Sequence, residues 1–127
     1  MKVIFHNNQL CIRGSTVALE DYARYNEEIL GNESIICYPA IGGNDPGVVA
    51  RIQNRFKTIA HHGPNDFQKI VDTEKADYSY FIRFGTRDFL PSNCRTGVHS
   101  VFRQYEPHGD TYAYVSEWVA ATMAKAH

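Results

Sequence analysis

Two hydrophobic patterns alternate along the chain: short continuous apolar runs, and longer stretches in which apolar residues recur at helical spacing. Runs of about four to eight apolar residues are typical of buried strands, and a repeat of about 3.6 residues is typical of amphipathic helices. The runs predict six strands, at residues 1–5, 34–38, 58–61, 78–84, 96–102 and 111–115. The helical stretches predict helices at residues 17–30, 46–56, 67–74 and 117–126.

The order of these segments predicts the fold class. Strand and helix alternate through the first two thirds of the chain, which favours a parallel sheet with helices on both faces and right-handed crossovers. With 127 residues and 43% hydrophobic content, we expect one Rossmann-like α/β domain over residues 1–127, a three-layer α/β/α arrangement around a mostly parallel six-stranded sheet. The loops beside the fifth strand are short for helical crossovers. They leave two alternatives, a single helical turn or one antiparallel strand.

The carboxyl ends of the strands are the expected ligand-binding edge, because ligands of such sheets bind there, near the reversal of strand order. Five loops would line this edge: residues 6–16, 42–45, 61–64, 85–88 and 103–110. The first of them ends in Arg13-Gly14-Ser15-Thr16, directly before a predicted helix. The free N–H groups of that helix suit a phosphate, with Gly14 allowing close approach. Alternatively, Gly14 only makes a tight turn and Ser15 or Thr16 only caps the helix. A single glycine favours this second interpretation.

Composition and charge narrow the function classes. A net charge of −1 gives no overall basic field of the kind that binds nucleic acid. The three cysteines are odd in number and widely spaced, which favours reduced thiols and a cytoplasmic protein. We recognise no signal peptide, because only three apolar residues follow Lys2 before His6, and no apolar stretch is long enough to form a transmembrane segment.

Several common catalytic motifs do not match. The G-x-G-x-x-G pattern of dinucleotide-binding domains and the Walker motif are both missing, and no G-x-S-x-G elbow is present. Adjacent His61 and His62 would point to opposite faces of a strand, and the aspartates are isolated. This spacing disfavours a bound metal, so we expect no metal site.

The remaining candidates are histidines and arginines near the carboxyl edge. His99, inside the fifth strand, is either a core histidine bonded to a backbone carbonyl or a group that reaches a ligand hydroxyl, and the same ambiguity holds for His6. Four arginines lie on the fourth and fifth strands and their loops: Arg83, Arg87, Arg95 and Arg103. Ordinary surface charge is the simpler interpretation for them. If two or three converge at the edge, they would suit a phosphate or an anionic acceptor.

Four segments in order add a family resemblance. The glycine loop and first helix (5–23), the mid-domain strand and its glycine (77–85), the histidine-bearing strand (98–102) and the closing strand and helix (112–119) resemble the N-terminal lobe of GT-B glycosyltransferases of the family-4 type. The resemblance implies a metal-independent, configuration-retaining transfer of a sugar from a nucleotide sugar, which would be a co-substrate rather than a cofactor. It also implies that the N-terminal lobe mainly binds the acceptor.

The resemblance also assigns roles to residues. His99 would lie near the donor sugar as the catalytic residue, and the loop of Gly14 to Thr16 would approach the donor phosphates. The expected substrate-binding residues are His6, Arg13, Gly14, Ser15, Thr16, Gly85, Arg87 and Arg103.

The chain departs from the family pattern in two respects. Its glycine loop holds a single glycine, and it has no second lobe with paired glutamates. We therefore expect a lobe that is inactive alone and works with a C-terminal GT-B lobe in cis or in trans, or that self-associates through its open cleft face. The alternative is a non-catalytic Rossmann-like module that binds a glycan or a phosphate ligand.

Overall fold

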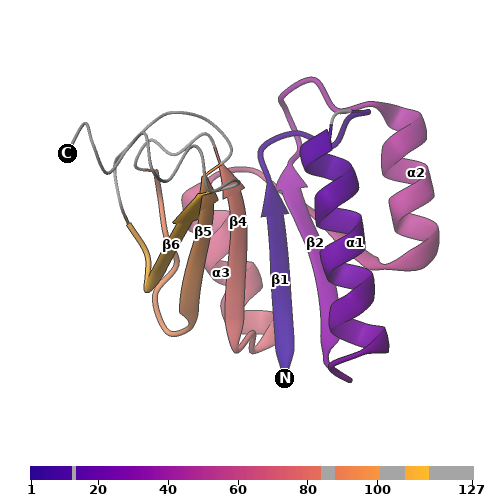
Figure 1. The fold of residues 1–127 in the computed structure, drawn as a ribbon. Coiled ribbons are helices and arrows are strands. Elements are labelled where there is room, and N and C mark those ends of the chain that lie inside the picture. Colours follow the sequence, from indigo (N-terminus) through magenta and orange to yellow (C-terminus); the bar gives the residue numbers. More distant parts are fainter. Residues whose placement is uncertain (13, 84–87, 101–107, 115–127) are drawn as a thin grey trace, which may run out of the picture.

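Six parallel strands form the centre of the computed structural model, in the order β3-β2-β1-β4-β5-β6 (Figure 1). The structure describes residues 1–12, 14–83, 88–100 and 108–114. The strands are β1 (Lys2–Asn7), β2 (Glu33–Pro39), β3 (Lys57–His61), β4 (Tyr78–Arg83), β5 (Arg95–Ser100) and β6 (Thr111–Tyr114). The described helices are α1 (Gly14–Glu28), α2 (Pro46–Arg55) and α3 (Pro64–Glu74).

This architecture confirms the predicted Rossmann-like α/β fold. It also excludes one of the two alternatives for the loops around β5, an antiparallel strand, because β4 pairs with β5 in parallel and β5 pairs with β6 in parallel. Within the described parts of those loops, residues 88–94 and 108–110, the backbone forms no helical turn. The helix expected at residues 117–126 lies outside the described residues.

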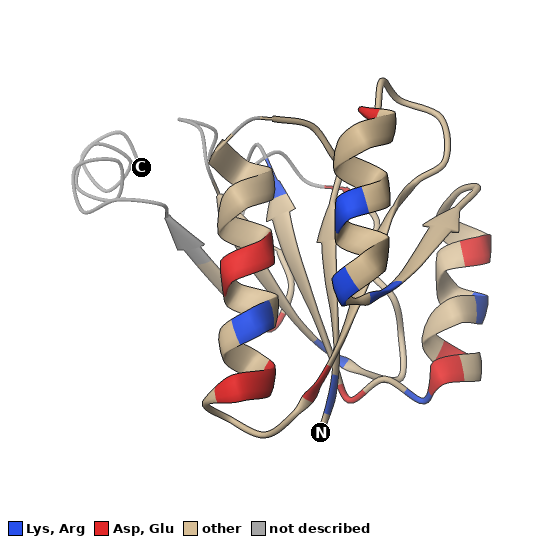
Figure 2. Ribbon diagram, turned by 90° about the vertical axis from the view of Figure 1, so that its right-hand side faces the viewer, with Lys and Arg blue, Asp and Glu red and all other residues tan. Residues whose placement is uncertain are grey.

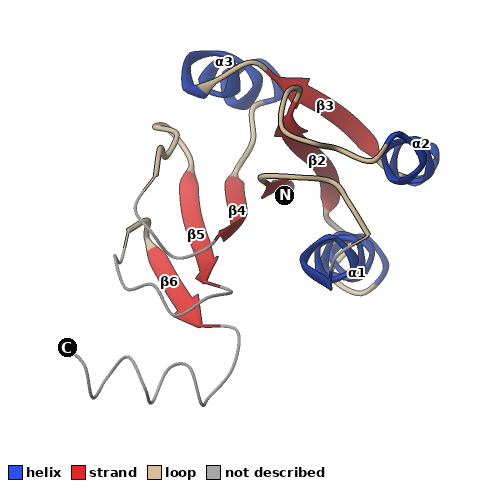
Figure 3. Cartoon of the chain, turned by 90° about the horizontal axis from the view of Figure 1, so that it is seen from above, coloured by secondary structure: helices blue, strands red, loops and turns tan. Residues whose placement is uncertain are grey.

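The helices divide between the two faces of the sheet. Helices α1 and α2 lie on one face, here called the α1 face, and α3 lies on the other, the α3 face (Figure 3). Each face has its own core, because successive residues of a strand point to opposite faces. The α1-face core includes Phe5, Leu19 and Ile52, and the α3-face core includes Ile4, Phe67 and Phe81. Part of the loop between β4 and β5 also packs on the α3 face, through Phe89 and Leu90.

The start of α2 follows the sequence prediction. Asp45 accepts hydrogen bonds at Oδ1 from the backbone N–H of Gly47 (2.8 Å) and of Val48 (3.2 Å), and Pro46 is the first helical residue. This N-cap satisfies donors that would otherwise be orphaned at the helix end.

The ends of α1 correct the prediction. The helix begins at Gly14 rather than at Val17, so Ser15 and Thr16 lie in its first turn. It ends at Glu28, before Gly31, whose φ of 70° is the left-handed conformation that favours glycine. Ile29 and Leu30, which helical spacing placed on the buried face, are therefore beyond the helix and are 72% and 68% exposed.

Charged residues mark the outer surfaces of the helices, as Figure 2 shows. Ion pairs join neighbouring helices: Arg51 of α2 contacts Glu20 of α1, and Arg55 contacts Glu27 at 2.7 Å. Surface pairs of this kind contribute about 0–1 kcal/mol each, so the two cores carry most of the stability. The cysteines Cys11, Cys37 and Cys94 are free. In the described part of the chain, every helix is too short or too polar to cross a membrane.

Candidate functional site

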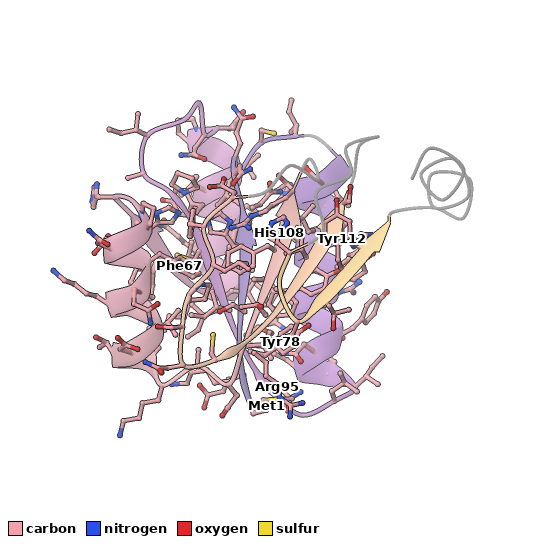
Figure 4. The ribbon with its side chains drawn as sticks, turned by 90° about the vertical axis from the view of Figure 1, so that its left-hand side faces the viewer. Met1, Phe67, Tyr78, Arg95, His108 and Tyr112 are labelled. Atoms are coloured by element: carbon pink, nitrogen blue, oxygen red, sulfur yellow. The ribbon has the colours of Figure 1, made fainter. Side chains whose placement is uncertain are left out.

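The strand order reverses between β1 and β4, the two central strands of the sheet. In sheets of this topology, the crevice outside the carboxyl ends at that point is where ligands bind. Figure 4 shows the direction of the sheet: Met1, Tyr78 and Arg95 lie toward its amino edge, and His108 lies toward its carboxyl edge. Two clusters of histidines and aromatic residues occur near this carboxyl edge, one on each face.

The loop from β1 to α1 is held by its own polar side chains. The Thr16 hydroxyl is buried, donates to the carbonyl of Gln9 (3.2 Å) and accepts from the backbone N–H of Cys11 (3.2 Å). The amide of Asn7 donates to Oγ of Ser15 (3.4 Å) and, at 3.5 Å, to Oγ1 of Thr16. Thr16 therefore shapes the loop from inside, a structural role that its position in the motif did not reveal.

A second loop of the expected edge is bonded to the first. The backbone N–H of Leu10 donates to the side chain of Asn44 (2.9 Å), and its carbonyl accepts from the N–H of Asp45 (2.8 Å). The Gln9 amide adds a bond to the carbonyl of Gly43 (2.7 Å). These contacts join the loops that precede α1 and α2 into one unit.

Gly14 is exposed at the start of α1. Its φ lies outside the positive range that excludes other residues, and a Cβ built there would meet no atom of the chain within 4 Å. The fold itself therefore does not require glycine at this position. The surroundings of Gly14 are open, as a ligand approaching the helix N-terminus would need. Its neighbour Arg13 lies outside the described residues.

The first cluster, on the α1 face, contains His99, Tyr80 and Tyr22. His99 is half-buried, and its Nδ1 lies 2.6 Å from the hydroxyl of Tyr80. The ring of Tyr22, from α1, stacks on the imidazole with centroids 6.2 Å apart. Burial raises the pKa of Tyr80 well above its usual range and lowers the pKa of His99, so both groups are neutral at neutral pH. Among the residues that the structure describes, none forms a hydrogen bond with Nε2 of His99.

The second cluster, on the α3 face, contains His6, His61, Arg83 and His108. Nε2 of His6 and Nε2 of His61 are 2.9 Å apart and buried. The rings of Phe67, Phe81 and Phe89 surround His6, with centroid distances of 5.2–5.8 Å. Burial, His61 and Arg83 together lower the pKa of His6 well below its usual value, so His6 is neutral at neutral pH.

The proton positions in the histidine pair follow from one backbone contact. The N–H of Gly63 donates to Nδ1 of His61 (3.1 Å), so this nitrogen carries no proton. Burial lowers the pKa of His61, and the neutral ring then carries its proton on Nε2 and donates it to Nε2 of His6. His6, itself neutral, must carry its proton on Nδ1. That N–H is buried and has no partner among the described residues.

Arg83 brings a positive charge into the same cluster. It is 2% exposed, and its Nη1 donates to Nε2 of His108 (2.9 Å) while its Nη2 donates to the carbonyl of Phe89. The guanidinium lies over the ring of Phe81, 4.1 Å from its centroid. Burial lowers the pKa of Arg83 to about 10, so the group stays charged at neutral pH.

Arg83 forms no ion pair within the described chain, although the exposed carboxylate of Asp88, beyond ion-pair distance, raises the pKa of Arg83 against the effect of burial. Its Nε is buried without a hydrogen-bond partner among the described residues. The two orphaned groups, Nδ1 of His6 and Nε of Arg83, are both donors. They lie on neighbouring strands and the same face, because His6 pairs in register with Phe81, two residues before Arg83.

The structure separates residues that the sequence placed on one edge. His6 belongs to the α3 face, whereas His99 and the first turn of α1 belong to the α1 face. Gly85, Arg87 and Arg103 lie outside the described residues.

Sequence reasoning also missed residues of the α3-face cluster. Surface charge was the simpler of two interpretations of Arg83, the other being anion binding with further arginines, and the side chain is buried. His61 was considered only as a metal ligand. The signal for Arg83 was present in the strand itself, since two-residue periodicity puts it on the same face as the core residue Phe81. In the described part of the chain, His, Cys, Asp and Glu side chains form no group of three that could hold a metal ion.

Comparisons with family models, with curated proteins and with solved structures found no match to this chain.

Proposed function

We propose that this domain is the acceptor-side lobe of a GT-B-type glycosyltransferase, which transfers a sugar from a nucleotide sugar together with a second lobe. The observation that carries the proposal is the α1-face cluster: His99 is positioned near the carboxyl end of β5 by Tyr80 and Tyr22, with Nε2 left free by the described residues. The strand order and the ordered sequence segments agree with such a lobe.

The distance between the start of α1 and His99 indicates which part of a ligand each would bind. Tyr22 and Gly14 belong to the same helix, eight positions apart, which corresponds to about 12 Å along the helix axis. An elongated ligand such as a sugar diphosphate could therefore reach from His99 to the start of α1. The helix N-terminus would bind a phosphate, and the neutral imidazole would form a hydrogen bond with a sugar hydroxyl. Tyr80 acts as a positioning residue that fixes the imidazole ring.

The test measures sugar transfer after the domain is combined with its cognate C-terminal lobe. We expect His99→Ala to lower the rate of transfer by about 10- to 100-fold, the effect of losing one hydrogen bond in a dry site. His62→Ala, which removes an exposed histidine, is the matched control and should leave the rate unchanged. Full activity of His99→Ala would refute the role of His99.

A second candidate is a binding module without catalysis, which recognises a glycan or a phosphate ligand. It is favoured by the make-up of the α1-face cluster, whose described members are a neutral histidine and two tyrosines, without a carboxylate that could act as a base. Saturable binding of a glycan or nucleotide by the domain, with no turnover when the second lobe is added, would support this candidate over the transferase.

A further inference from the structure

The α3-face cluster lies on the opposite side of the sheet from the proposed transferase site, and it has an incomplete set of hydrogen bonds. Nδ1 of His6 and Nε of Arg83 are both buried donors with no acceptor in the part of the chain that the structure describes. Native proteins leave few such groups unpaired, because each costs about 1–3 kcal/mol and a charged group costs more. The missing partner must accept two hydrogen bonds.

The sign of the charge selects an anion as that partner. Arg83 is charged, whereas His6 and His61 are neutral. Nε2 of His108 accepts from the guanidinium, so the side chains of the cluster carry a net positive charge.

Two carboxylates lie near the cluster but form no ion pair with Arg83. Asp66 accepts from the N–H of His62 (2.9 Å), and exposed Asp88 accepts from the N–H of Phe89 (2.7 Å) and only partly offsets the effect of burial on the pKa of Arg83. A cation would be repelled, and a neutral water would leave Arg83 without an ion-pair partner in the cluster.

The surroundings would strengthen the binding of an anion. The rings of Phe67, Phe81 and Phe89 enclose His6, and the rings of Phe81 and Phe89 flank the guanidinium. Because such apolar walls exclude water, electrostatic attraction between the guanidinium and an anion is stronger there than at the surface.

The two free donors also restrict the geometry of the ligand. Each terminal nitrogen of Arg83 donates one hydrogen bond to the chain, to His108 and to Phe89, whereas Nε has no partner among the described residues. An anion would accept one hydrogen bond from Nε of Arg83 and a second from Nδ1 of His6. We propose that the α3-face cluster is a binding site for a small oxyanion group, a phosphate or a carboxylate, held between Nδ1 of His6 and Nε of Arg83.

The experiment follows the imidazole nitrogens of the ¹⁵N-labelled wild-type domain by NMR during separate titrations with inorganic phosphate, acetate and chloride at constant ionic strength. The proposal predicts a saturable shift of the Nδ1–H signal of His6 with phosphate or acetate, and the stronger of the two identifies the ligand class. His62, exposed on the neighbouring loop, serves as the internal reference and should not shift.

Two results would overturn the proposal: a His6 signal that stays unchanged with all three anions, or saturation by chloride alone. Arg83→Lys adds a second test, because it keeps the charge and removes the Nε donor. We expect it to weaken oxyanion binding about ten-fold, and unchanged affinity in a folded variant would contradict the site. If this variant does not fold, the wild-type titration decides the matter by itself.

Discussion

The histidines on the two faces of the carboxyl edge differ in burial and in hydrogen bonding. On the α1 face, His99 is half-buried, bonded to a tyrosine hydroxyl and stacked on an exposed ring. On the α3 face, His6 is fully buried, bonded to a second histidine and left with an unpaired donor beside a charged arginine. The first arrangement suits contact with an uncharged hydroxyl, whereas the second suits an anion. The two sites proposed at this sheet edge therefore differ in their chemistry and lie on opposite faces of the sheet.

The largest predicted difference between the faces concerns the pH dependence of stability. Burial, His61 and Arg83 lower the pKa of the fully buried His6 well below the ordinary value of about 6.5, whereas burial alone lowers the pKa of the half-buried His99. As the pH falls below about 6.5, the unfolded chain binds protons that the folded chain does not, so the free energy of unfolding decreases. Each such histidine contributes up to about 1.4 kcal/mol per pH unit until its folded-state pKa is reached.

Two variants isolate these contributions. Urea unfolding between about pH 7 and pH 5 should show a flatter stability curve for His6→Gln than for His99→Gln. Glutamine at position 6 keeps an acceptor for the Nε2–H of His61, which limits the structural damage. Equal slopes for the two variants would contradict the predicted difference between His6 and His99 in their contribution to the pH dependence of stability.

A smaller effect is expected at Gly14, on the α1 face. Because an added Cβ meets open space and φ is not positive, Gly14→Ala should stabilise the domain by about 0.4–1 kcal/mol. If the N-terminus of α1 binds a phosphate, the same methyl group should weaken the binding of a nucleotide sugar. Thermal unfolding and ligand titration measure the two effects separately. Stabilisation with unchanged ligand affinity would remove Gly14 from the proposed site.

Much of the fold could be predicted from the sequence because its signals are local. Continuous apolar runs predicted the strands, and the Asp45-Pro46 pair predicted the start of α2. The end of α1 was placed too late because apolar Ile29 and Leu30 continue the helical spacing, although the backbone leaves the helix at Glu28.

The site was harder to predict because it depends on faces and register. A strand buried on both sides carries no alternation of polar and apolar residues, so the sequence around His6 does not reveal which face its side chain joins. The hydrogen bond between His6 and His61 joins β1 to β3, which are separated by β2 in the sheet. The two histidines are 55 positions apart in the sequence. The tautomers depend in turn on a single backbone N–H, that of Gly63, which no motif encodes.

The protonation states of His6 and His61 test the central claim most directly. An imidazole ¹H–¹⁵N correlation spectrum of the ligand-free domain at about pH 7 distinguishes the two neutral tautomers from each other and from the charged ring. The structure predicts a neutral His6 protonated on Nδ1 and a neutral His61 protonated on Nε2. A charged His6, or a His6 protonated on Nε2, would contradict the assignment of a neutral His6 that offers a free N–H at Nδ1.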